Sequence, residues 1–337
     1  MTILVTGGTG YIGSHTCVEL LEGGHDVVAV DNFSNSHHEV AERVERVTGR
    51  PLPIIELDLR SRDGLRAVFA AHGIEAVIHF AGLKAMGESV AQPLTYFDAN
   101  ICSILVLAEI MAEFAVETLI FSSSATVYGE PDELPIPETA PLKRPTSPYG
   151  RSKFFIEEIL RDLRVADPGW KVGLLRYFNP VGAHPSGLIG EDPLGVPNNL
   201  MPIVAATAAG RRESVCVFGE DYPTTDGTGV RDYIHVVDLA RAHVAALDYL
   251  RKKPHGEELT ANLGTGRGYS VLEVIRAFEA ASGRPIPYTI SDRRPGDVAT
   301  CYADSGLAER LLDWRAEHGL ERMCEDVWRW QTYLEQD

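Results

Sequence analysis

Short apolar runs alternate with segments of helical length through the first half of the chain. The runs lie at Ile3–Val5, Val27–Val30, Ile54–Leu57, Ala76–Phe80, Leu119–Phe121 and Val172–Leu175. Alternation of this kind predicts parallel strands with helices on both faces of the sheet. We therefore expect an α/β fold built on a Rossmann-type doubly wound parallel sheet, whose ligands would bind at the carboxyl ends of the strands.

A glycine-rich turn, TGGTGYIG, directly follows the first predicted strand and carries Gly7, Gly10 and Gly13. Glycines here permit a tight turn and a close approach of backbone to a pyrophosphate, and the next helix offers unpaired N–H groups. Asp31 ends the second strand, where a carboxylate bonds an adenosine ribose 2′-OH and repels a 2′-phosphate. No Arg or Lys occurs in Asn32–Asn35, so the pattern predicts NAD rather than NADP.

Two later strand ends are also candidates for this cofactor. Asp58 ends the third strand, where it would bond the adenine amine or simply shape a turn, and both readings stay open. Phe80, Ala81 and Gly82 end the fourth strand. Small residues there would let a dinucleotide lie close to the sheet.

Tyr149 and Lys153 stand four residues apart after Ser147 and Pro148, which are typical first residues of a helix. Their side chains share one helix face. A free Tyr has a pKa of about 10, so acting as a base near pH 7 needs a shift of about 3 units, or about 4 kcal/mol. A cation about 6 Å away supplies about 2.8 kcal/mol at an effective dielectric near 20. An oxidised nicotinamide would add the remaining positive charge; without that context the spacing describes an ordinary surface helix.

Charge and cysteine content exclude several classes of partner and site. The 337 residues carry a net charge of -17, which argues against nucleic acid or anionic membranes as partners. The five cysteines are odd in number and scattered, so they predict no disulfide or metal framework and fit a cytoplasmic protein. No segment is expected to reach membrane-spanning length.

The alternating pattern breaks after about Asn179. Residues 179–199 are dense in Gly and Pro and predict a long loop into a second, smaller α+β region. A strand at 232–237, followed by a helix at 238–250, is expected to return to the sheet, and further helices are expected at 270–281 and 321–334. We thus expect an NAD-binding domain, 1–180 with 233–262, and a substrate-binding domain, 181–232 with 263–337.

Other polar residues carry simpler expectations. Glu157, Glu158, Arg161 and Arg164 are expected to form a solvated face of the helix that carries Tyr149. His15, His79 and His235 lie in packed-looking segments without the spacing of metal ligands.

Seven motifs together resemble the UDP-glucose 4-epimerase family, an extended branch of the short-chain dehydrogenases/reductases. They are TGGTGYIG, FAGLKAMGES, SSSATVYG, SPYGRSK, LRYFNPVGAH, PNNLMP and DGTGVRDYIHV. The resemblance runs from about residue 2 to residue 330. It implies an isomerase of galactose metabolism that interconverts UDP-galactose and UDP-glucose with tightly bound NAD. It also implies a homodimer formed by the helix after Phe97 and the helix carrying Tyr149.

In such an enzyme Tyr149 would be the base, Lys153 its pKa-lowering and ribose-binding partner, and Ser124 a hydrogen-bond partner of the reacting hydroxyl. Hydride would leave C4 of the hexose, and the 4-keto sugar would turn over and take the hydride back on its other face. The cofactor residues implied are Gly7, Gly10, Tyr11, Ile12, Gly13, Asp31, Asn32, Asn35, Ser36, Asp58, Leu59, Phe80, Ala81, Gly82, Lys84, Asn100, Ser122, Tyr149, Lys153 and Phe178.

The substrate residues implied are Lys84, Ser124, Tyr149, Phe178, Asn179, Asn199, Leu200, Val215, Cys216, Val217, Phe218, Arg231, Tyr233, Arg294, Asp297 and Cys301. Arg231 and Arg294 would supply the local positive charge that a diphosphate needs in an acidic protein. Simpler roles stay open: an ion pair with Asp232 for Arg231, a solvated Arg293–Arg294 pair, edge packing for 215–218, and a loop position for Lys84.

Cys301 occupies a position that is a large Tyr in some members of the resembled family and small in others. A small side chain would leave volume beside C2 of the sugar for an N-acetyl group. The hypothesis is that UDP-N-acetylgalactosamine and UDP-N-acetylglucosamine are also interconverted; the alternative is a buried structural cysteine.

Three other functions compete. Another nucleotide-sugar epimerase of the same family would share all these motifs. A nucleotide-sugar 4,6-dehydratase needs an added acid/base pair, commonly an Asp-Glu beside the active-site hydroxyl, whereas Ser124 is followed by Ala125, Thr126 and Val127. A non-catalytic NAD sensor would have no need of Tyr149 with Lys153.

Overall fold

The computed structural model describes residues 1–195, 197, 199–294 and 297–335. Its largest sheet has seven parallel strands in the order β10-β6-β5-β4-β1-β2-β3. Their bounds are β1 Thr2–Thr6, β2 Asp26–Asp31, β3 Ile54–Glu56, β4 Ala76–His79, β5 Thr118–Ser124, β6 Lys171–Tyr177 and β10 Glu258–Leu263. The six strands expected in the first half are confirmed, and the order is that of a doubly wound dinucleotide-binding sheet.

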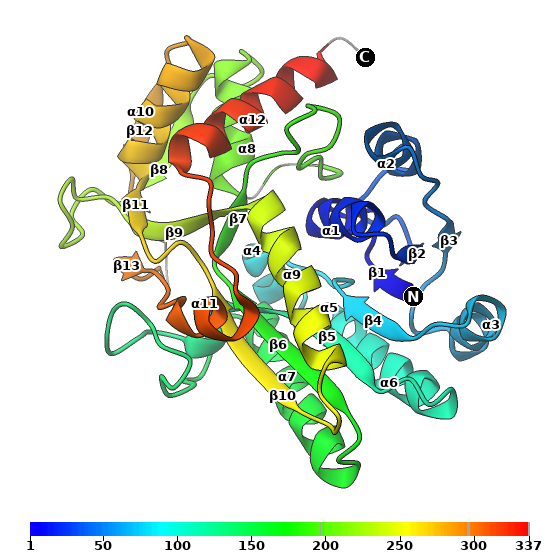
Figure 1. The fold of residues 1–337 in the computed structure, drawn as a ribbon. Helices are drawn as coiled ribbons and strands as arrows, with labels where there is room; N and C mark the ends of the chain where they lie inside the picture. Colours follow the sequence, from blue (N-terminus) through cyan, green and yellow to red (C-terminus); the bar gives the residue numbers. More distant parts are fainter. Residues whose placement is uncertain (196, 198, 295–296, 336–337) are drawn as a thin grey trace.

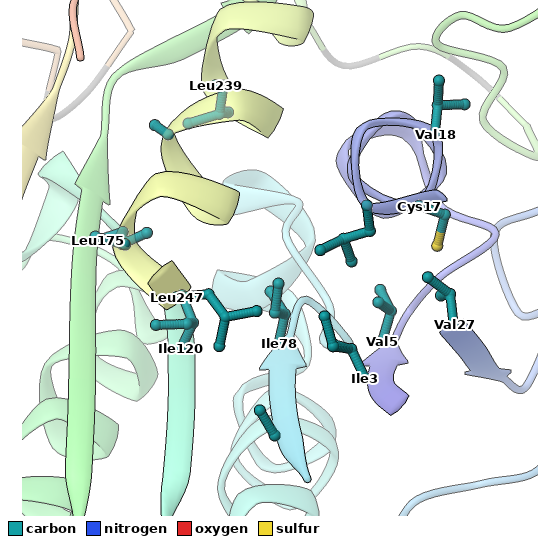
Figure 2. Close-up of a cluster of buried hydrophobic side chains, with 14 of the residues drawn as sticks. Ile3, Val5, Cys17, Val18, Val27, Ile78, Ile120, Leu175, Leu239 and Leu247 are labelled. Carbon is teal, nitrogen blue, oxygen red and sulfur yellow. The ribbon is translucent and has the colours of Figure 1, made fainter. Parts of the chain in front are cut away.

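Helices cover both faces of this sheet (Figure 1). One face carries α1 (Tyr11–Glu22), α2 (Val40–Thr48) and α9 (Val236–Arg251), and the other carries α3 (Arg62–His72), α6 (Ser103–Glu113) and α7 (Pro148–Ala166). Figure 2 shows the first of the two apolar layers, in which Ile78 and Ile120 of the sheet lie below Leu239 and Leu247 of α9. Burial on both faces explains why these strands read as continuous apolar runs.

A second unit is built around short strands. A four-stranded sheet contains β7 (Asn179–Val181), β9 (Val230–His235), β11 (Gly268–Ser270) and β13 (Thr300–Cys301), and β8 (Val215–Phe218) pairs with β12 (Tyr288–Ser291). Its helices are α8 (Leu200–Ala208), α10 (Val271–Ser282) and α12 (Leu320–Leu334), whereas α11 (Gly306–Leu312) packs against α9 and β10 of the large sheet. The helices expected at 270–281 and 321–334 are therefore confirmed.

Two expectations about this region are wrong. The strand expected at 232–237 is β9, which pairs with β7, β11 and β13 instead of returning to the large sheet. Only the helix after it, α9, lies against the large sheet, and β10 completes that sheet. The loop expected from residue 179 begins as strand β7, and its residues 196 and 198 lie outside the described residues.

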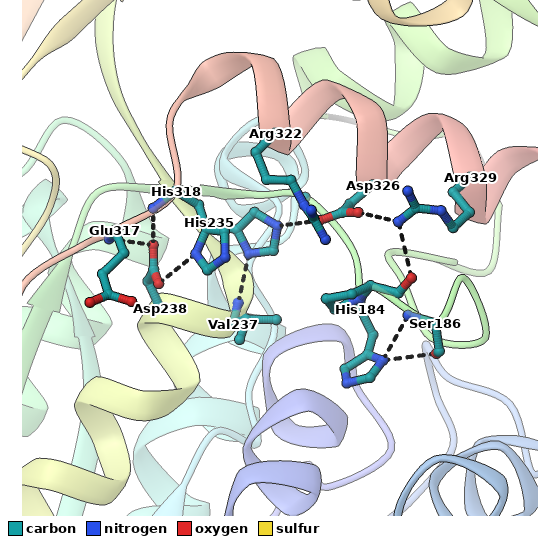
Figure 3. A network of polar contacts seen from close by, with 12 residues as sticks. His184, Ser186, His235, Val237, Asp238, Glu317, His318, Arg322, Asp326 and Arg329 are labelled. Carbon is teal, nitrogen blue, oxygen red and sulfur yellow. Dashed lines mark hydrogen bonds and ion pairs between the residues drawn. The ribbon is translucent and has the colours of Figure 1, made fainter.

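Buried ionic groups fix the C-terminal helix to the rest of the molecule (Figure 3). Asp326 of α12 is fully buried and accepts hydrogen bonds from Arg322 at 2.6 Å and from Arg329, and it pairs with His235 Nε2 at 3.2 Å. Val237 N donates to His235 Nδ1 at 3.1 Å, so the imidazole also caps α9. The expectation that His235 is a packed residue is confirmed.

The longest apolar helical run extends from Pro93 to Glu113. It comprises α5 (Pro93–Phe97), a π-helical turn (Asp98–Cys102) and α6. Its 21 residues and a mean hydropathy of 1.5 would suffice to cross a membrane by length and composition alone, so the expectation that no segment reaches that length is wrong. Ile104, Leu107 and Met111 of this run are buried in the second apolar layer.

Candidate active site

The helix that carries Tyr149 and Lys153 begins as the sequence predicts. Ser147 is its N-cap and its Oγ accepts a 3.1 Å hydrogen bond from Gly150 N, while Pro148 occupies the first turn. Both side chains of the pair are buried on the face of α7 that meets the sheet.

Strand β5 delivers hydroxyl and carbonyl groups to this pair. Lys153 Nζ donates a 2.8 Å hydrogen bond to the carbonyl oxygen of Ser122 and lies 4.7 Å from the ring centroid of Phe121. The Tyr149 phenol is hydrogen-bonded to Ser124. Ser124 Oγ also accepts from Thr126 N at 3.2 Å, because it caps the short 3₁₀ helix Ala125–Tyr128. The three residues proposed for proton transfer therefore meet at the carboxyl end of β5.

Burial sets the protonation states of the pair. It raises the pKa of Tyr149 well above its usual range, although the hydrogen bond from Ser124 opposes this shift. Burial also lowers the pKa of Lys153 to about 8, and the charge of Glu157 opposes that shift. The protein alone thus keeps the phenol neutral, so proton removal from a substrate requires additional positive charge beside Tyr149.

The glycine-rich turn forms a cradle that only glycine fits. At Gly7, φ is +68° and a Cβ atom would lie 2.7 Å from Ala81 N, while at Gly13 it would lie 2.1 Å from Gly7 O. Gly10, the N-cap of α1, provides no side-chain cap, so the first N–H groups of that helix are available to an anion. The residues present fit a bound pyrophosphate.

Asp31 is turned toward this cradle from the end of β2. Its Oδ2 accepts from Thr9 N at 3.1 Å, and its Oδ1 accepts from Phe33 N at 3.0 Å and Ser36 Oγ at 3.2 Å. A buried carboxylate fixed this way suits a ribose diol and disfavours a 2′-phosphate.

The remaining cofactor candidates differ in their surroundings. Asp58 accepts from Arg60 N and Nε, both at 2.9 Å, which favours the turn role for it. Asn100 is buried and accepts from Leu83 N at 2.8 Å, and its Nδ2 donates to Ser152 Oγ at 3.0 Å, so it ties the loop after Gly82 to α7.

The other cofactor candidates lie at the same edge of the sheet as the glycine-rich turn or in the turns that follow its strands. They are Tyr11, Ile12, Asn32, Asn35, Leu59 and Phe178.

Two arginines approach each other in the second unit. Arg231 Nη2 lies 3.9 Å from Asp297 Oδ1, and Arg294 Nε donates to Asp297 Oδ2 at 2.9 Å. Arg294 also lies over the ring of Phe218 at 4.8 Å. An ion pair of Arg231 with Asp232 is not what the structure has, because the Asp232 carboxylate bonds elsewhere, including Thr265 Oγ1 at 2.6 Å.

The other substrate candidates line up beside them. Asn179 Nδ2 donates to Asp232 O at 3.0 Å, and Cys301, half-buried, pairs in register with Arg231. Along β8, Val215 and Val217 are buried whereas Cys216 and Phe218 are not, so packing describes the two valines. Asn199 precedes Leu200 at the start of α8, and its Nδ2 donates to Glu191 Oε1 at 2.8 Å. Tyr233 is buried in β9.

Lys84 occupies an exposed loop position, whereas Glu157 departs from the expectation made for it. Lys84 is 48% exposed and its Nζ donates to Glu191 Oε1 at 3.1 Å. Glu157 is fully buried against Arg176, so its assignment to a solvated helix face is wrong. The signal that could have revealed it is an arginine in the middle of the apolar run at 172–177, because a buried strand tolerates such a charge only with a partner.

His15 and His79 are buried as expected. Among the described residues no group of three or more His, Cys, Asp or Glu side chains could hold a metal ion.

Comparisons with known proteins agree with this geometry. Residues 3–264 match the model of the NAD dependent epimerase/dehydratase family. UDP-glucose 4-epimerase of Bacillus subtilis (strain 168) is 58% identical over 332 residues, which are 98% of this chain and 97% of that protein. UDP-glucose 4-epimerase of Mus musculus is 56% identical over 335 residues, 98% and 96% of the two chains.

Solved structures give the same result. The structure of UDP-glucose 4-epimerase from Bifidobacterium longum in complex with NAD+ and UDP superposes with a TM-score of 0.96 at 56% identity, covering 99% of this chain and 98% of that chain. UDP-glucose-4-epimerase from Stenotrophomonas maltophila, with bound NAD and formylated UDP-arabinopyranose, has a TM-score of 0.97 at 51% identity, covering 100% and 99%.

Proposed function

The chain belongs to the NAD dependent epimerase/dehydratase family, and from this premise we propose that it interconverts UDP-galactose and UDP-glucose by inverting C4 of the hexose. The observation that carries the proposal is the meeting of Tyr149, Lys153 and Ser124 at the end of β5. Close relatives named UDP-glucose 4-epimerase, two of them with NAD bound, support the reaction and its cofactor.

NAD, when bound, accepts and returns a hydride and brings the positive charge of its nicotinamide. Tyr149 takes the proton from the O4 hydroxyl as hydride leaves C4, and gives it back when the 4-keto sugar is reduced on its other face. Ser124 bonds the same oxygen and orients it. Lys153 stays positively charged and favours the phenolate.

The nucleotide part of the substrate is assigned to the second unit. Arg231 and Arg294 approach Asp297 together and would turn to a diphosphate, which accepts bidentate hydrogen bonds from guanidinium groups. Phe218 provides a ring that Arg294 already covers. Asn179 begins β7 and Asn199 is the N-cap of α8. Both are assigned to the nucleotide sugar.

Substrate range is assigned to Cys301. Its register with Arg231 on β9 supports a position beside the sugar, and a thiol leaves room there that a phenol would fill. We therefore extend the proposal to UDP-N-acetylgalactosamine and UDP-N-acetylglucosamine.

The assembly proposed is a homodimer. Large apolar side chains are exposed on α4 (Met86–Ala91), α5, α6 and α7, including Val90 at 64%, Leu94 at 80%, Leu105 at 41% and Phe155 at 43%. Such a grouping marks an interface rather than a free surface.

A cytoplasmic location is supported by the five free thiols. The division into an NAD-binding domain at 1–180 with 233–262 and a substrate-binding domain at 181–232 with 263–337 remains a prediction.

The direct test is to incubate the pure protein with UDP-galactose and without added NAD while following UDP-glucose. Conversion would establish epimerisation with a retained cofactor. The absence of conversion even with added NAD would contradict the proposal and favour another nucleotide-sugar epimerase of the family, which other UDP-sugars would then reveal. A dehydratase would release a 4-keto-6-deoxy sugar instead.

A further inference from the structure

The helix that carries Tyr149 and Lys153 has a third side chain joined to the end of β5. Glu157 lies one helical turn beyond Lys153, and its Oε1 accepts a 2.5 Å hydrogen bond from Ser123 Oγ. Ser123 stands between the residue whose carbonyl holds Lys153 and the residue whose hydroxyl meets Tyr149. Three successive turns of α7 therefore attach to three successive residues of β5.

The Glu157 carboxylate is buried and is hydrogen-bonded at both oxygens. Glu157 is 0% exposed and Arg176, on the neighbouring strand β6, is 2% exposed. Arg176 Nε and Nη2 donate to Oε1 and Oε2 of Glu157 at 3.0 and 2.6 Å, and Arg161 Nη2 donates at 3.2 Å. Buried ion pairs contribute little net stability compared with apolar residues of the same volume, so stability alone does not account for this one.

The same guanidinium extends the network toward the substrate side. Arg176 Nη1 donates to Tyr128 Oη at 3.0 Å, and Tyr128 Oη donates to Asn262 Oδ1 at 2.7 Å. Asn262 Nδ2 then donates to the carbonyl oxygen of Asp304 at 3.3 Å, three residues beyond Cys301. These hydrogen bonds therefore join Glu157 both to the end of β5 and to the segment that follows Cys301.

Glu157 also faces Lys153 without competition from other carboxylates among the described residues. Tyr149 shares the helix with Lys153, and His79 on β4 also faces the ammonium. Tyr177 on β6 and His243 on α9 contact Ser122, whose carbonyl holds the ammonium. Burial lowers the pKa of His79 to about 3 and that of His243 to about 4, and burial raises the pKa of Tyr177. These groups are uncharged near pH 7.

We propose that Glu157 is a positioning residue of the proton-transfer site: through Ser123 it fixes the end of β5 that presents Ser124, and its charge keeps Lys153 protonated. The inference rests on the proposed function for its effect on turnover. Its electrostatic half concerns only this chain and can be measured without substrate.

The test compares Glu157→Gln, which keeps the shape and removes the charge, with Glu158→Gln. Glu158 is the next residue of the same helix, is 51% exposed and bonds Arg161, so it is a matched control. The chain has six lysines, Lys84, Lys143, Lys153, Lys171, Lys252 and Lys253. Carbon NMR of NAD-loaded protein labelled at lysine Cε therefore resolves the Lys153 titration, assigned by its loss in Lys153→Arg.

In Glu157→Gln the Lys153 midpoint should fall by about two pH units relative to the control, since a charge one turn away acts at about 6 Å with an effective dielectric near 20. With UDP-galactose, kcat should fall about tenfold or more while KM stays within about threefold, because the misplaced groups act only on the reacting hydroxyl. A midpoint that does not move, or a kcat within about twofold of Glu158→Gln, overturns the proposal.

Ser123→Ala keeps the buried ion pair and removes only the bridging hydroxyl, so it decides the positioning role if Glu157→Gln does not fold. It should lower kcat with KM unchanged, and an unchanged kcat would contradict that role. If the unaltered protein does not convert UDP-galactose, the proposed function fails, and the lysine titration still decides whether Glu157 holds the charge of Lys153.

Discussion

Lys153 Nζ lies 2.8 Å from the carbonyl oxygen of Ser122, so the strand that presents the Ser124 hydroxyl also holds the ammonium. One backbone carbonyl thereby fixes the distance between the cation and the hydroxyl. The position of Tyr149 follows, because it stands one helical turn from Lys153 and is hydrogen-bonded to Ser124.

Tyr149→Phe should lower kcat for UDP-galactose by about 10²- to 10⁴-fold, because it removes the only group proposed to take the O4 proton. Bound NAD, measured by release on denaturation, should stay at the level of the unaltered protein. The control is Tyr249→Phe, at the end of α9 away from the site, which removes a hydroxyl that donates to Glu257. It should keep full activity. Full activity in Tyr149→Phe would show that another group takes the O4 proton, whereas a variant that lost activity but kept its full biological role would favour a sensor.

The rate should fall as pH rises through the pKa of Lys153, which burial lowers to about 8. Below that pH the ammonium is charged and favours the Tyr149 phenolate. Above it the proton is lost, and the phenol returns to its raised pKa. The pH dependence of kcat for UDP-galactose measures this, and Lys153→Arg, whose charge persists to higher pH, should lack the alkaline fall. An alkaline fall at the same pH in that variant would assign it to another group.

Cys301→Tyr should abolish conversion of UDP-N-acetylgalactosamine and leave conversion of UDP-galactose within about threefold, because a phenol fills the space beside C2 and touches nothing that reacts. Parallel assays of the two sugars check this. Cys102→Ser, a change at a free cysteine in the π-helical turn before α6, should alter neither rate. Acetylated-sugar activity that survives in Cys301→Tyr would show that the side chain does not set the substrate range.

Asp31→Asn should weaken retention of NAD and reduce discrimination against NADP by about tenfold, because it removes the charge that repels a 2′-phosphate. The protein can be refolded with equal amounts of NAD and NADP, and the dinucleotide that stays bound can then be identified. Asp26, exposed at the start of the same strand, supplies the control Asp26→Asn. An unchanged NAD-to-NADP ratio in Asp31→Asn would remove this carboxylate from cofactor selection.

Leu94→Glu should convert a dimer into a monomer of the 36.9 kDa chain, since Leu94 is the most exposed large apolar side chain of the α4–α7 surface, at 80%. Burying an unpaired charge at an interface costs roughly several kcal/mol of association free energy. Sedimentation velocity of the two proteins distinguishes the states. Leu311→Glu, on α11, should remain dimeric; a monomeric unaltered protein would refute the assembly.

Local sequence patterns predicted those parts of the fold whose signals lie within a few residues. The strands from β1 to β6 are apolar because both faces of the sheet are covered, and the Ser147–Pro148 start of α7 is visible in the sequence itself. Strand β10 was missed because ELTANL alternates apolar and polar residues. The residues of β9, VRDYIH, favour a strand, but they do not indicate which sheet that strand will pair with.

The site shows the same division. Gly7, Gly13, Asp31 and the Tyr149–Lys153 pair were predicted because each sits at a fixed spacing from a strand or helix end. Glu157 was misplaced because Glu157, Glu158 and Arg161 form ordinary surface pairs on an isolated helix. Its burial is decided by Arg176, which only folding brings to it from another strand.

The chain passes between the two units five times, after β6, after β9, after β10, after β13 and after α11 (Figure 1). A fragment that stopped at residue 180 would lack α9, leaving α1 uncovered, and would lack β10, leaving β6 as a bare hydrogen-bonding edge. Such an edge invites aggregation. The nucleotide-binding unit is thus not one continuous segment of the chain. Chimaeras between relatives must exchange residues 236–263 together with the N-terminal segment.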